Sequence, residues 1–336
     1  MQKSKVRIAL DVMGGDFAPH NELKAATGIK SKYSDTVELI LVGNESVIRH
    51  ELSQMKENPD GFEILNANDV ITMNDDPTEV HRTKRESSIY RGLEYHKSGG
   101  SDAFVSAGNT GAMLALSTIL LGRIKGVARP TIGTFFPSKK EKPVLIVDVG
   151  ATLEPRPRYL YEFAVMGSIY YKQIAGEVNP SVALLNIGEE EVKGTEIVKE
   201  TYALLKDSTL NFIGNIEGRD IFDAKADVVV CDGFVGNIVL KFAESFLGML
   251  KSTIKSYSEQ NLMNKIKVGL MVPVLKDVLK ALNYEIYGGV PLLGVNGVSI
   301  IGHGSSSVLA TENMILTARD MVNADINTKI ENALKK

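Results

Sequence analysis

Six short loops rich in Gly, Asn, Asp and Ser hold the residues of this sequence that could do chemistry. Each follows an apolar run, and most lead into a helical pattern. They read Met13-Gly14-Gly15-Asp16, Ser106-Ala107-Gly108-Asn109-Thr110-Gly111, Asp148-Val149-Gly150-Ala151, Asn186-Ile187-Gly188-Glu189, Asp232-Gly233-Phe234-Val235-Gly236-Asn237 and His303-Gly304-Ser305-Ser306-Ser307. Glycine lets backbone N–H groups approach a ligand, and the N-terminus of a following helix favours an anion. The loops therefore predict a site for a phosphate-like group along the carboxyl edge of a parallel sheet.

Two of these loops are the strongest candidates. In the first, Ser106, Asn109 and Thr110 stand between a strand and a helix, so side-chain and backbone donors meet at a helix start. A plain turn with Thr110 as helix cap explains the same residues equally well. The loop at 303–307 repeats the design and adds His303, a titratable group beside an anion-binding cap.

Carboxylates and cations stand in the other loops. Asp16, Asp148 and Asp232 each end a strand next to Gly, where capping of a turn is the simplest role. Lys193 precedes a helix cap, and Arg219 suits bidentate contact with phosphate, although a solvated lysine and an Arg–Asp pair are equal alternatives. The sequence shows no Cys/His cluster and no carboxylate spacing that demands a metal.

Size and charge limit the class of protein. The chain has 336 residues, 44% of them hydrophobic, and a net charge of −3, as in a globular protein with a sizeable core and no general affinity for nucleic acid. Cys231 is the one cysteine, which excludes an intrachain disulfide and suits a reducing cytosol. The first residues lack a signal-peptide layout, and the longest apolar stretch, Ala112 to Leu121, is about half a membrane span. We expect a soluble protein.

Three well-known loop motifs are missing. The sequence has no Gly-x-x-x-x-Gly-Lys-Ser/Thr loop, no Gly-x-Ser-x-Gly elbow and, in its first strand–helix loop, no Gly-x-Gly-x-x-Gly. These absences argue against a P-loop nucleotide site, an α/β-hydrolase and a standard dinucleotide site. A chain that binds phosphate without these devices is a candidate for one that uses phosphate as a reactant.

Strands and helices must hold these loops in place. Runs of β-branched residues alternate with amphipathic segments along the chain, which predicts a mostly parallel sheet covered by helices. The strands are expected at Val6–Val12, Val37–Val42, Phe62–Leu65, Ala103–Ser106, Ile132–Phe136, Val144–Val147, Val182–Asn186, Phe212–Ile216, Asp227–Val230 and Val298–Ile301. The helices are expected at Glu22–Ser31, Ser46–Met55, Thr78–Lys97, Thr110–Gly122, Arg158–Ala175, Thr195–Lys206, Asn237–Ser256, Leu262–Ala281 and Ser305–Leu334. Residues 131–142, with Pro130 and Pro143 at the two ends and Pro137 inside, predict a crossover or hairpin.

One region departs from this rhythm. Two long helical patterns follow one another from Asn237 to Ala281, which predicts a helical hairpin projecting from the sheet. Its second arm mixes lysines with a dense apolar run. Core packing or a dimer contact is the simplest role, and a surface for a membrane or a partner is the alternative. No linker divides the chain, so we expect one domain over residues 1–336 with the hairpin inserted at 237–282.

Taken together, the motifs resemble the bacterial phosphate acyltransferase family of phospholipid synthesis. The resemblance runs in order through nearly the whole chain. It rests on Asp11-Val12-Met13-Gly14-Gly15-Asp16 with Ala18-Pro19, Ser106-Ala107-Gly108-Asn109-Thr110-Gly111-Ala112, Asp148-Val149-Gly150-Ala151, Asn186-Ile187-Gly188 with Lys193-Gly194, Phe212-Ile213-Gly214-Asn215 with Glu217 and Arg219-Asp220, Asp232-Gly233-Phe234 with Gly236-Asn237, Tyr287-Gly288-Gly289, and His303-Gly304-Ser305-Ser306. One position departs: Thr152 stands where the family usually has Asn, which alters a polar contact there.

The resemblance implies a three-layer α/β/α fold like that of phosphotransacetylases and of isocitrate and isopropylmalate dehydrogenases. It implies formation of acyl phosphate from long-chain acyl-ACP (acyl carrier protein) and inorganic phosphate, with release of ACP and without a cofactor or metal. It also implies a homodimer in the cytoplasm, peripherally associated with the membrane, where acyl phosphate feeds a glycerol-3-phosphate acyltransferase. The hairpin lysines at 251, 255, 265, 267, 276 and 280 are candidates to meet acidic ACP.

Site roles follow as expectations from that reaction. A thioester is already activated, so phosphate can attack it directly. The residues expected to bind phosphate are Ser106, Gly108, Asn109, Thr110, Gly304, Ser305 and Ser306. Those expected to act in catalysis are His303, as the proton carrier, with Asn109, Lys193 and Arg219. The loops expected on the acyl and pantetheine side carry Asp16, Asp148, Thr152, Asp232 and Asn237.

Three other readings make different predictions. A dehydrogenase of the related fold would need a nicotinamide site and usually a divalent metal. A short-chain phosphotransacetylase would use coenzyme A in place of a carrier protein. A membrane-recruited scaffold would bind lipid without turnover, and the polar loops count against it.

Overall fold

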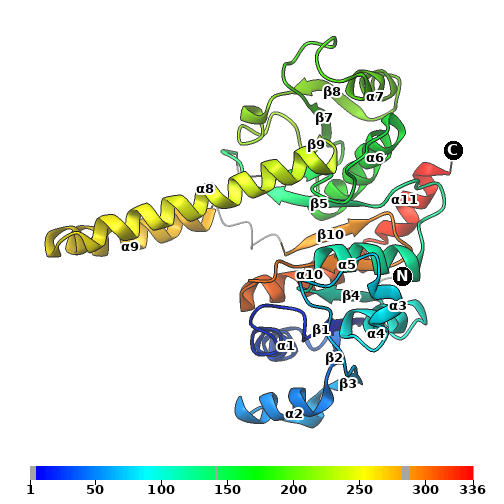
Figure 1. Ribbon diagram of the computed structural model, residues 1–336. Helices are drawn as coiled ribbons and strands as arrows, with labels where there is room; N and C mark the ends of the chain where they lie inside the picture. The colour runs from blue at the N-terminus through cyan, green and yellow to red at the C-terminus, as the bar shows by residue number, and fades with distance from the viewer. Residues whose placement is uncertain (1–4, 141, 282–287, 336) are drawn as a thin grey trace.

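An eleven-stranded sheet forms the centre of the protein, with the strand order β3-β2-β1-β4-β11-β10-β5-β6-β9-β7-β8. The computed structural model describes residues 5–140, 142–281 and 288–335, and only the backbone of residues 276–281. Figure 1 shows β1 to β4 with α1, α4 and α10 in the lower half, and β7 to β9 with α6 and α7 in the upper half. Strands β10 and β5 join the two halves.

The strands have these bounds: β1 Val6–Asp11, β2 Val37–Gly43, β3 Glu63–Asn66, β4 Ala103–Ser106, β5 Thr131–Phe136, β6 Val144–Val147, β7 Ser181–Leu185, β8 Asn211–Ile216, β9 Val228–Val230, β10 Val290–Leu293 and β11 Val298–Ile301. The α-helices are α1 His20–Tyr33, α2 Glu45–Gln54, α3 Val80–Thr83, α4 Ser88–Lys97, α5 Thr110–Leu116, α6 Pro157–Ile174, α7 Glu196–Lys206, α8 Gly233–Glu259, α9 Leu262–Ala281, α10 Val308–Asn323 and α11 Ile326–Leu334. Three shorter turns are η1 Pro59–Gly61, the π-helical η2 Ser117–Leu121 and η3 Gly218–Asp220.

Helices cover both faces of the sheet. Neighbouring residues of a strand point to opposite faces, and in β1 Ile8 belongs to one buried cluster while Ala9 belongs to another. The first cluster receives side chains from α1, α2, α6, α7, α10 and α11. The second receives side chains from α3, α4, α5 and the base of α8. The expected three-layer α/β/α fold with a mostly parallel sheet is therefore confirmed.

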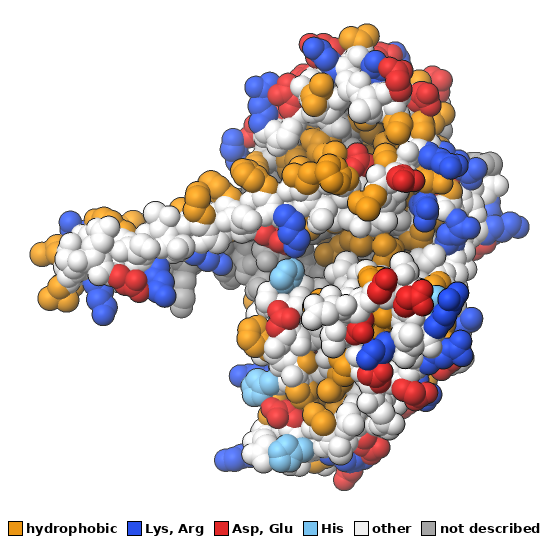
Figure 2. All heavy atoms as spheres, in the orientation of Figure 1, with side chains coloured by type: hydrophobic (Ala, Val, Ile, Leu, Met, Phe, Trp, Pro, Cys, Tyr) orange, Lys and Arg blue, Asp and Glu red, His pale blue; other side chains and the backbone are white. Residues whose placement is uncertain are grey.

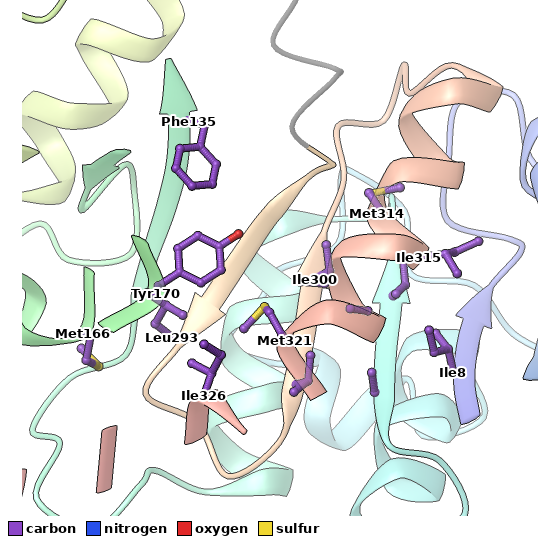
Figure 3. Close-up of a cluster of buried hydrophobic side chains, with 14 of the residues drawn as sticks. Ile8, Phe135, Met166, Tyr170, Leu293, Ile300, Met314, Ile315, Met321 and Ile326 are labelled. Atoms are coloured by element: carbon purple, nitrogen blue, oxygen red, sulfur yellow. The ribbon is translucent and has the colours of Figure 1, made fainter. Parts of the chain in front are cut away.

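The first cluster crosses from one half of the molecule to the other. Figure 3 shows Phe135 and Tyr170 of the upper half beside Leu293 of β10, with Ile300 and Met314 of the lower half beyond them. The rings of Phe135 and Tyr170 stack with their centroids 5.6 Å apart. All these side chains belong to one buried cluster, so β10 and β5 lie within a shared core.

The sheet reverses direction at its centre, and this separates loops that we expected to lie together. Strand β10 is antiparallel to β11 and to β5, and β5 is antiparallel to β6. Strands β6, β9, β7 and β8 are parallel to one another and therefore run opposite to β1, β4 and β11 along the ladder. The expectation of six loops along one carboxyl edge is wrong. The loops fall into two groups, one in each half.

Most other expected elements are present, with differences that have local causes. The hairpin expected over 131–142 is the β5–β6 pair. The helix expected at Thr78–Lys97 breaks into α3 and α4, because Ser87 caps a new start by accepting from Tyr90 N at 3.3 Å. The helix expected at Ser305–Leu334 breaks at Asp325, whose φ of 49° is left-handed. Strand β10 was not predicted, since Pro291 lowers the strand signal.

Helices α8 and α9 pack together and project as one arm away from the sheet (Figure 1). Helix α8 begins at Gly233 because Asp232 caps it, accepting a hydrogen bond from Val235 N at 2.9 Å. Gly233 and Gly236 are the buried residues of α8, and both lie at its base. By length and composition alone α8 is long and apolar enough to cross a membrane, and only 11% of its apolar window is buried within the protein. The assignment of one domain over 1–336 with an insertion over 237–282 stays a prediction, and residue 282 lies outside the described range.

The base of α8 depends on the missing side chain of Gly236. A Cβ there would stand 1.9 Å from the carbonyl oxygen of Asp148, whereas a Cβ on Gly248 of the same helix would meet nothing within 4 Å. We expect Gly236→Ala to lower the free energy of unfolding by about 2 kcal/mol or more, because backbone must move. Gly248→Ala is the matched control, expected to raise it by up to about 1 kcal/mol. Urea titration of both variants measures the difference, and equal effects would contradict the packing described.

Candidate functional site

The loops that follow β1, β4 and β11 interlock through their backbones, and we call them the first loop group (residues 12–16, 106–111 and 302–307). Asp16 N donates to Gly304 O at 2.7 Å, and Gly302 N donates to Ser106 O at 2.8 Å. A Cβ on Gly14 would stand 2.8 Å from Gly108 N. Glycine is needed for this approach, and three segments far apart in sequence form one backbone surface.

A buried carboxylate holds two of these loops in place. Ser106 Oγ donates to Asp11 Oδ2 at 2.7 Å and accepts from Gly108 N at 3.0 Å, while Met13 N donates to Asp11 Oδ1 at 3.0 Å. Burial raises the pKa of Asp11, and these hydrogen bonds oppose the rise. The Ser106 hydroxyl and the Gly108 N–H are thus engaged within the protein and brace the loop.

Asp11 was not among the residues to which we gave a role. In the sequence Asp11 is a lone acid in an apolar strand. This pattern indicates a buried carboxylate with hydrogen-bond donors, but it does not identify the donors.

Asn109, and not Thr110, caps helix α5. Its Oδ1 accepts from Ala112 N at 3.0 Å, and its Nδ2 donates to Thr72 O at 3.0 Å. Thr110 is exposed. Within the described part of the chain, no hydrogen bond is made to the backbone N–H groups of Thr110, Gly111 or Gly304. The loops that carry these donors are joined by the hydrogen bond from Gly302 N to Ser106 O, and unpaired backbone N–H groups at a helix start suit an anion.

His303 stands exposed on the first loop group with a defined ring orientation. Ser305 N donates to His303 Nδ1 at 3.2 Å, and Ser305 Oγ lies 2.8 Å from the same nitrogen. Because Nδ1 accepts from a backbone N–H, the proton of the neutral ring is on Nε2. The Ser306 hydroxyl is engaged within the loop, since its Oγ donates to His303 O at 2.6 Å. The loop presents one N–H of an imidazole to solvent.

The second loop group joins the ends of β6 and β9 (residues 148–152 and 231–237). Asp148 Oδ1 accepts from the backbone N–H groups of Ile132, Gly150 and Ala151 at 3.0–3.2 Å. No partner of Asp148 Oδ2 is found among the described residues, and burial raises the pKa of this carboxyl to about 6. Gly233 N donates to Thr152 O at 2.9 Å.

Thr152 and Cys231 are both buried in this group. The Thr152 hydroxyl has no hydrogen-bond partner in the described ranges. Cys231 Sγ donates to Asp148 O at 3.4 Å, and burial raises the pKa of its thiol. Cys231 is a core thiol that directly follows the three buried valines of β9. Asn237 is exposed. A Cβ on Gly150 would stand 3.8 Å from the Asn237 side chain, an ordinary van der Waals contact.

The two expected cations lie elsewhere. Arg219 Nε pairs with Glu217 at 3.0 Å on the surface after β8, and Lys193 is exposed in the loop after β7. Strands β11, β10, β5, β6 and β9 separate β7 from β4 in the sheet. No contact of either cation with the first loop group is found among the residues that the structure describes. Their roles in catalysis stay predictions.

The residues expected on the acyl side divide between the groups. Asp16 belongs to the first, whereas Asp148, Thr152, Asp232 and Asn237 belong to the second. Figure 2 shows the surface hollowed between the two halves, below the base of the α8–α9 arm, with hydrophobic side chains inside the hollow. Among the described residues there is no group of three His, Cys, Asp or Glu side chains that could hold a metal ion. Tyr287, part of the motif that ends in Gly288-Gly289, lies outside the described residues.

Comparison with known proteins gives a match over nearly the full chain. A family model described as "Fatty acid synthesis protein" matches residues 6–329. Phosphate acyltransferase of Heliobacterium modesticaldum is 46% identical over 97% of both chains, and that of Halothermothrix orenii is 43% identical over 98% of this chain and 99% of its own. Among solved structures, EutD phosphotransacetylase from Staphylococcus aureus has a TM-score of 0.64 at 17% identity, covering 95% of this chain and 94% of its own. A phosphotransacetylase from Streptococcus pyogenes has the same TM-score at 18% identity. At this identity the structural likeness concerns the fold.

The raised pKa of Asp148 makes stability depend on pH. The folded chain holds the proton up to about pH 6, whereas a carboxyl in the unfolded chain releases it near pH 3.8, so folding is favoured at low pH and loses stability as the pH rises between these values. In Asp148→Asn this loss is absent. We expect the variant to gain up to about 3 kcal/mol relative to the native chain between about pH 4 and pH 7.5.

Denaturant titration across that range measures the gain. Asp76→Asn is the control with the opposite sign, because hydrogen bonds from Thr78 lower the pKa of exposed Asp76, whose contribution is present at neutral pH and lost in acid. A constant difference between Asp148→Asn and the native chain would contradict the description of this carboxyl.

Proposed function

The chain belongs to the fatty acid synthesis protein family, whose curated relatives are named phosphate acyltransferases, and from that premise we propose that it moves a long-chain acyl group from acyl carrier protein to inorganic phosphate. The products are acyl phosphate and the free carrier thiol. The observation that carries the proposal is the first loop group, which turns the N-terminus of α5 and the loop before α10 toward one backbone surface beside His303.

The proposed phosphate site lies on that surface. Ser106, Gly108, Asn109 and Ser306 brace the loops through the bonds described above. The groups left to face an anion are the backbone N–H groups of Thr110, Gly111 and Gly304 and the hydroxyl of Thr110, whereas the Ser305 hydroxyl is already hydrogen-bonded to His303 Nδ1 at 2.8 Å. Backbone donors at a helix start favour a multiply charged phosphate without a bound metal.

The proposed reaction is a direct transfer. A phosphate oxygen attacks the thioester carbonyl, a tetrahedral oxyanion forms, and the carbon–sulfur bond breaks to give acyl phosphate and a thiolate. The proton for this thiolate comes from the imidazolium form of His303 through Nε2, since Nδ1 is turned to the Ser305 hydroxyl 2.8 Å away, and the ring takes up the proton of the attacking phosphate in exchange. Phosphate held beside the carbonyl supplies orientation, and loop N–H groups stabilise the oxyanion.

The remaining residues have proposed roles in the other half of the hollow. The second loop group is assigned to the acyl and pantetheine side of the donor through Asp148, Thr152, Asp232 and Asn237, together with Asp16 from the first. The proposed role of Lys193 and Arg219 is to balance the charge of phosphate. Both lie in the other half of the molecule, so this role requires the two halves to come closer together. The reaction uses no cofactor.

The α8–α9 arm is assigned to contacts with larger partners. Phe242 of α8 is 73% exposed, and Leu262 at the tip is 74% exposed. We assign the exposed apolar side chains of α8 (Phe234, Ile238, Phe242, Phe246 and Met249) to contact with a second copy of the chain. The tip of the arm, with Lys265 and Lys267, is assigned to an anionic membrane surface. The hairpin lysines also suit acidic ACP; the side chains of Lys276 and Lys280 lie outside the described set. In this role the enzyme works in the cytoplasm, at the membrane surface where a glycerol-3-phosphate acyltransferase consumes acyl phosphate.

Two substitutions test the active site. We expect His303→Ala to lower kcat about 100-fold because the proton donor is lost, and Asn109→Ala to lower kcat/KM about 10- to 100-fold because the α5 loop is no longer held. The assay is phosphate-dependent release of thiol from palmitoyl-ACP, with acetyl-CoA as an alternative donor and NAD(P) as a control.

His50→Ala, an exposed histidine on α2, is the matched control and should behave as the native enzyme. Near-native kinetics in both site variants would refute the site. Turnover of acetyl-CoA in place of acyl-ACP would refute the assigned donor, and a requirement for NAD(P) would refute the reaction.

The arm is tested separately from chemistry. We expect Phe242→Glu to weaken self-association in sedimentation, and the pair Leu262→Glu and Met263→Glu to reduce binding to vesicles of anionic phospholipid at least about tenfold, since each places charge on an apolar contact. Leu204→Glu, on the exposed face of α7, is the control. Unchanged association and vesicle binding in both arm variants would remove these assignments.

A further inference from the structure

A bare carboxyl lies directly behind the first loop group. Glu22, in the first turn of α1, is 2% exposed. A Cβ on Gly15 would stand 2.2 Å from Oε1 of Glu22, so the carboxyl lies directly against this glycine. No hydrogen-bond partner of its Oε2 is found in the part of the chain that the structure describes. Gly15 and Asp16 form the strand–helix loop that donates to Gly304 O. The carboxyl therefore sits against the backbone that builds the proposed phosphate surface.

The surroundings of Glu22 favour its neutral form. Burial raises its pKa to about 7, and the negative charges of Asp11 and Asp16 act in the same direction, while His20 opposes them. No lysine or arginine pairs with Glu22 among the described residues. The titratable and charged groups around it include Asp11 of β1, Asp16 of the loop, His20 and Lys32 of α1, Glu51 of α2, which pairs with His20, His303 of the first loop group, and Glu312 of α10, which pairs with Lys32.

We propose that Glu22 is a positioning residue that couples phosphate binding to one proton: with Glu22 neutral the first loop group accepts the anion, and with Glu22 ionised it repels it. The inference rests on the proposed phosphate site. Glu22 acts through the loop backbone in front of it and does not touch the substrate. Among the described residues no cation pairs with this carboxyl and its Oε2 has no hydrogen-bond partner, so its charge is felt by an anion on the other side of Gly15.

Linkage fixes the sign of the effect. If ionised Glu22 weakens phosphate binding, bound phosphate must raise the pKa of Glu22 by the same free energy, and binding near neutral pH takes up a proton. The KM for phosphate then rises with pH above about 7, while kcat, measured with the site filled, changes little. Inorganic phosphate itself changes charge in this range, and the ratio of native enzyme to variant cancels that contribution.

Glu22→Gln is the decisive variant because it keeps the shape of the neutral acid and cannot ionise. We expect the ratio of KM for phosphate, native over variant, to rise at least about fivefold between about pH 6 and pH 8.5, with the ratio of kcat flat. Calorimetry with inorganic phosphate, in buffers of different ionisation enthalpy, should show proton uptake near pH 7 for the native enzyme and less for Glu22→Gln. Glu22→Asp should restore part of the pH dependence.

Glu51→Gln is the matched control. It removes a carboxylate that pairs with His20 at 2.8 Å on the same side of the molecule, and its KM ratio should stay flat. Phosphate binding with equal proton uptake in native enzyme and Glu22→Gln would overturn the inference and leave the proposed function standing. No phosphate binding by folded native enzyme would overturn the phosphate site and the inference with it. If Glu22→Gln changed kcat and KM by constant factors at every pH, Glu22 would have a structural role only. This result would also overturn the inference.

Discussion

The hydrogen bond from Ser106 to the buried carboxylate of Asp11 is the contact on which the candidate site depends. It joins the end of β4 to the end of β1, and through Gly108 N it fixes the turn that starts α5. The neighbouring loop reaches the same surface only because Gly14 has no side chain, since a Cβ there would stand 2.8 Å from Gly108 N. A polar anchor in the core and glycines above it therefore place donors from three distant segments side by side.

Buried carboxyls near glycine loops are a common theme of both halves. Asp11, Glu22 and Asp148 are each buried, and desolvation raises the pKa of each. Asp11 has donors for both of its oxygens, whereas Glu22 and Asp148 each leave one oxygen without a partner among the described residues. Burial of a partly satisfied acid costs stability at neutral pH. Such a cost is understandable where the acid shapes a loop or responds to a ligand.

The reversal of the sheet at β10 and β5 gives the molecule two halves with one shared core. Each half keeps parallel strands and its own group of loops, and the first cluster of buried side chains runs through both (Figure 3). The arm of α8 and α9 leaves the base of the second loop group, so its direction is set where Gly236 packs on Asp148.

The sequence by itself determined the fold class, the positions of nearly all strands and the glycine loops of the candidate site, because strand alternation, glycine and capping residues act locally. Asn44 starting α2 is an example of such local control, whereas Asp232 starts α8 at Gly233, four residues before the expected start at Asn237. Tertiary structure alone decided which loops meet. The antiparallel pairing of Pro291-containing β10, the union of Gly14 with Gly108 and the placing of Glu22 behind Gly15 join residues far apart in the chain, and no periodicity encodes such contacts. Lys193 and Arg219 were grouped with the first loops by residue type, and the strand order placed them in the other half.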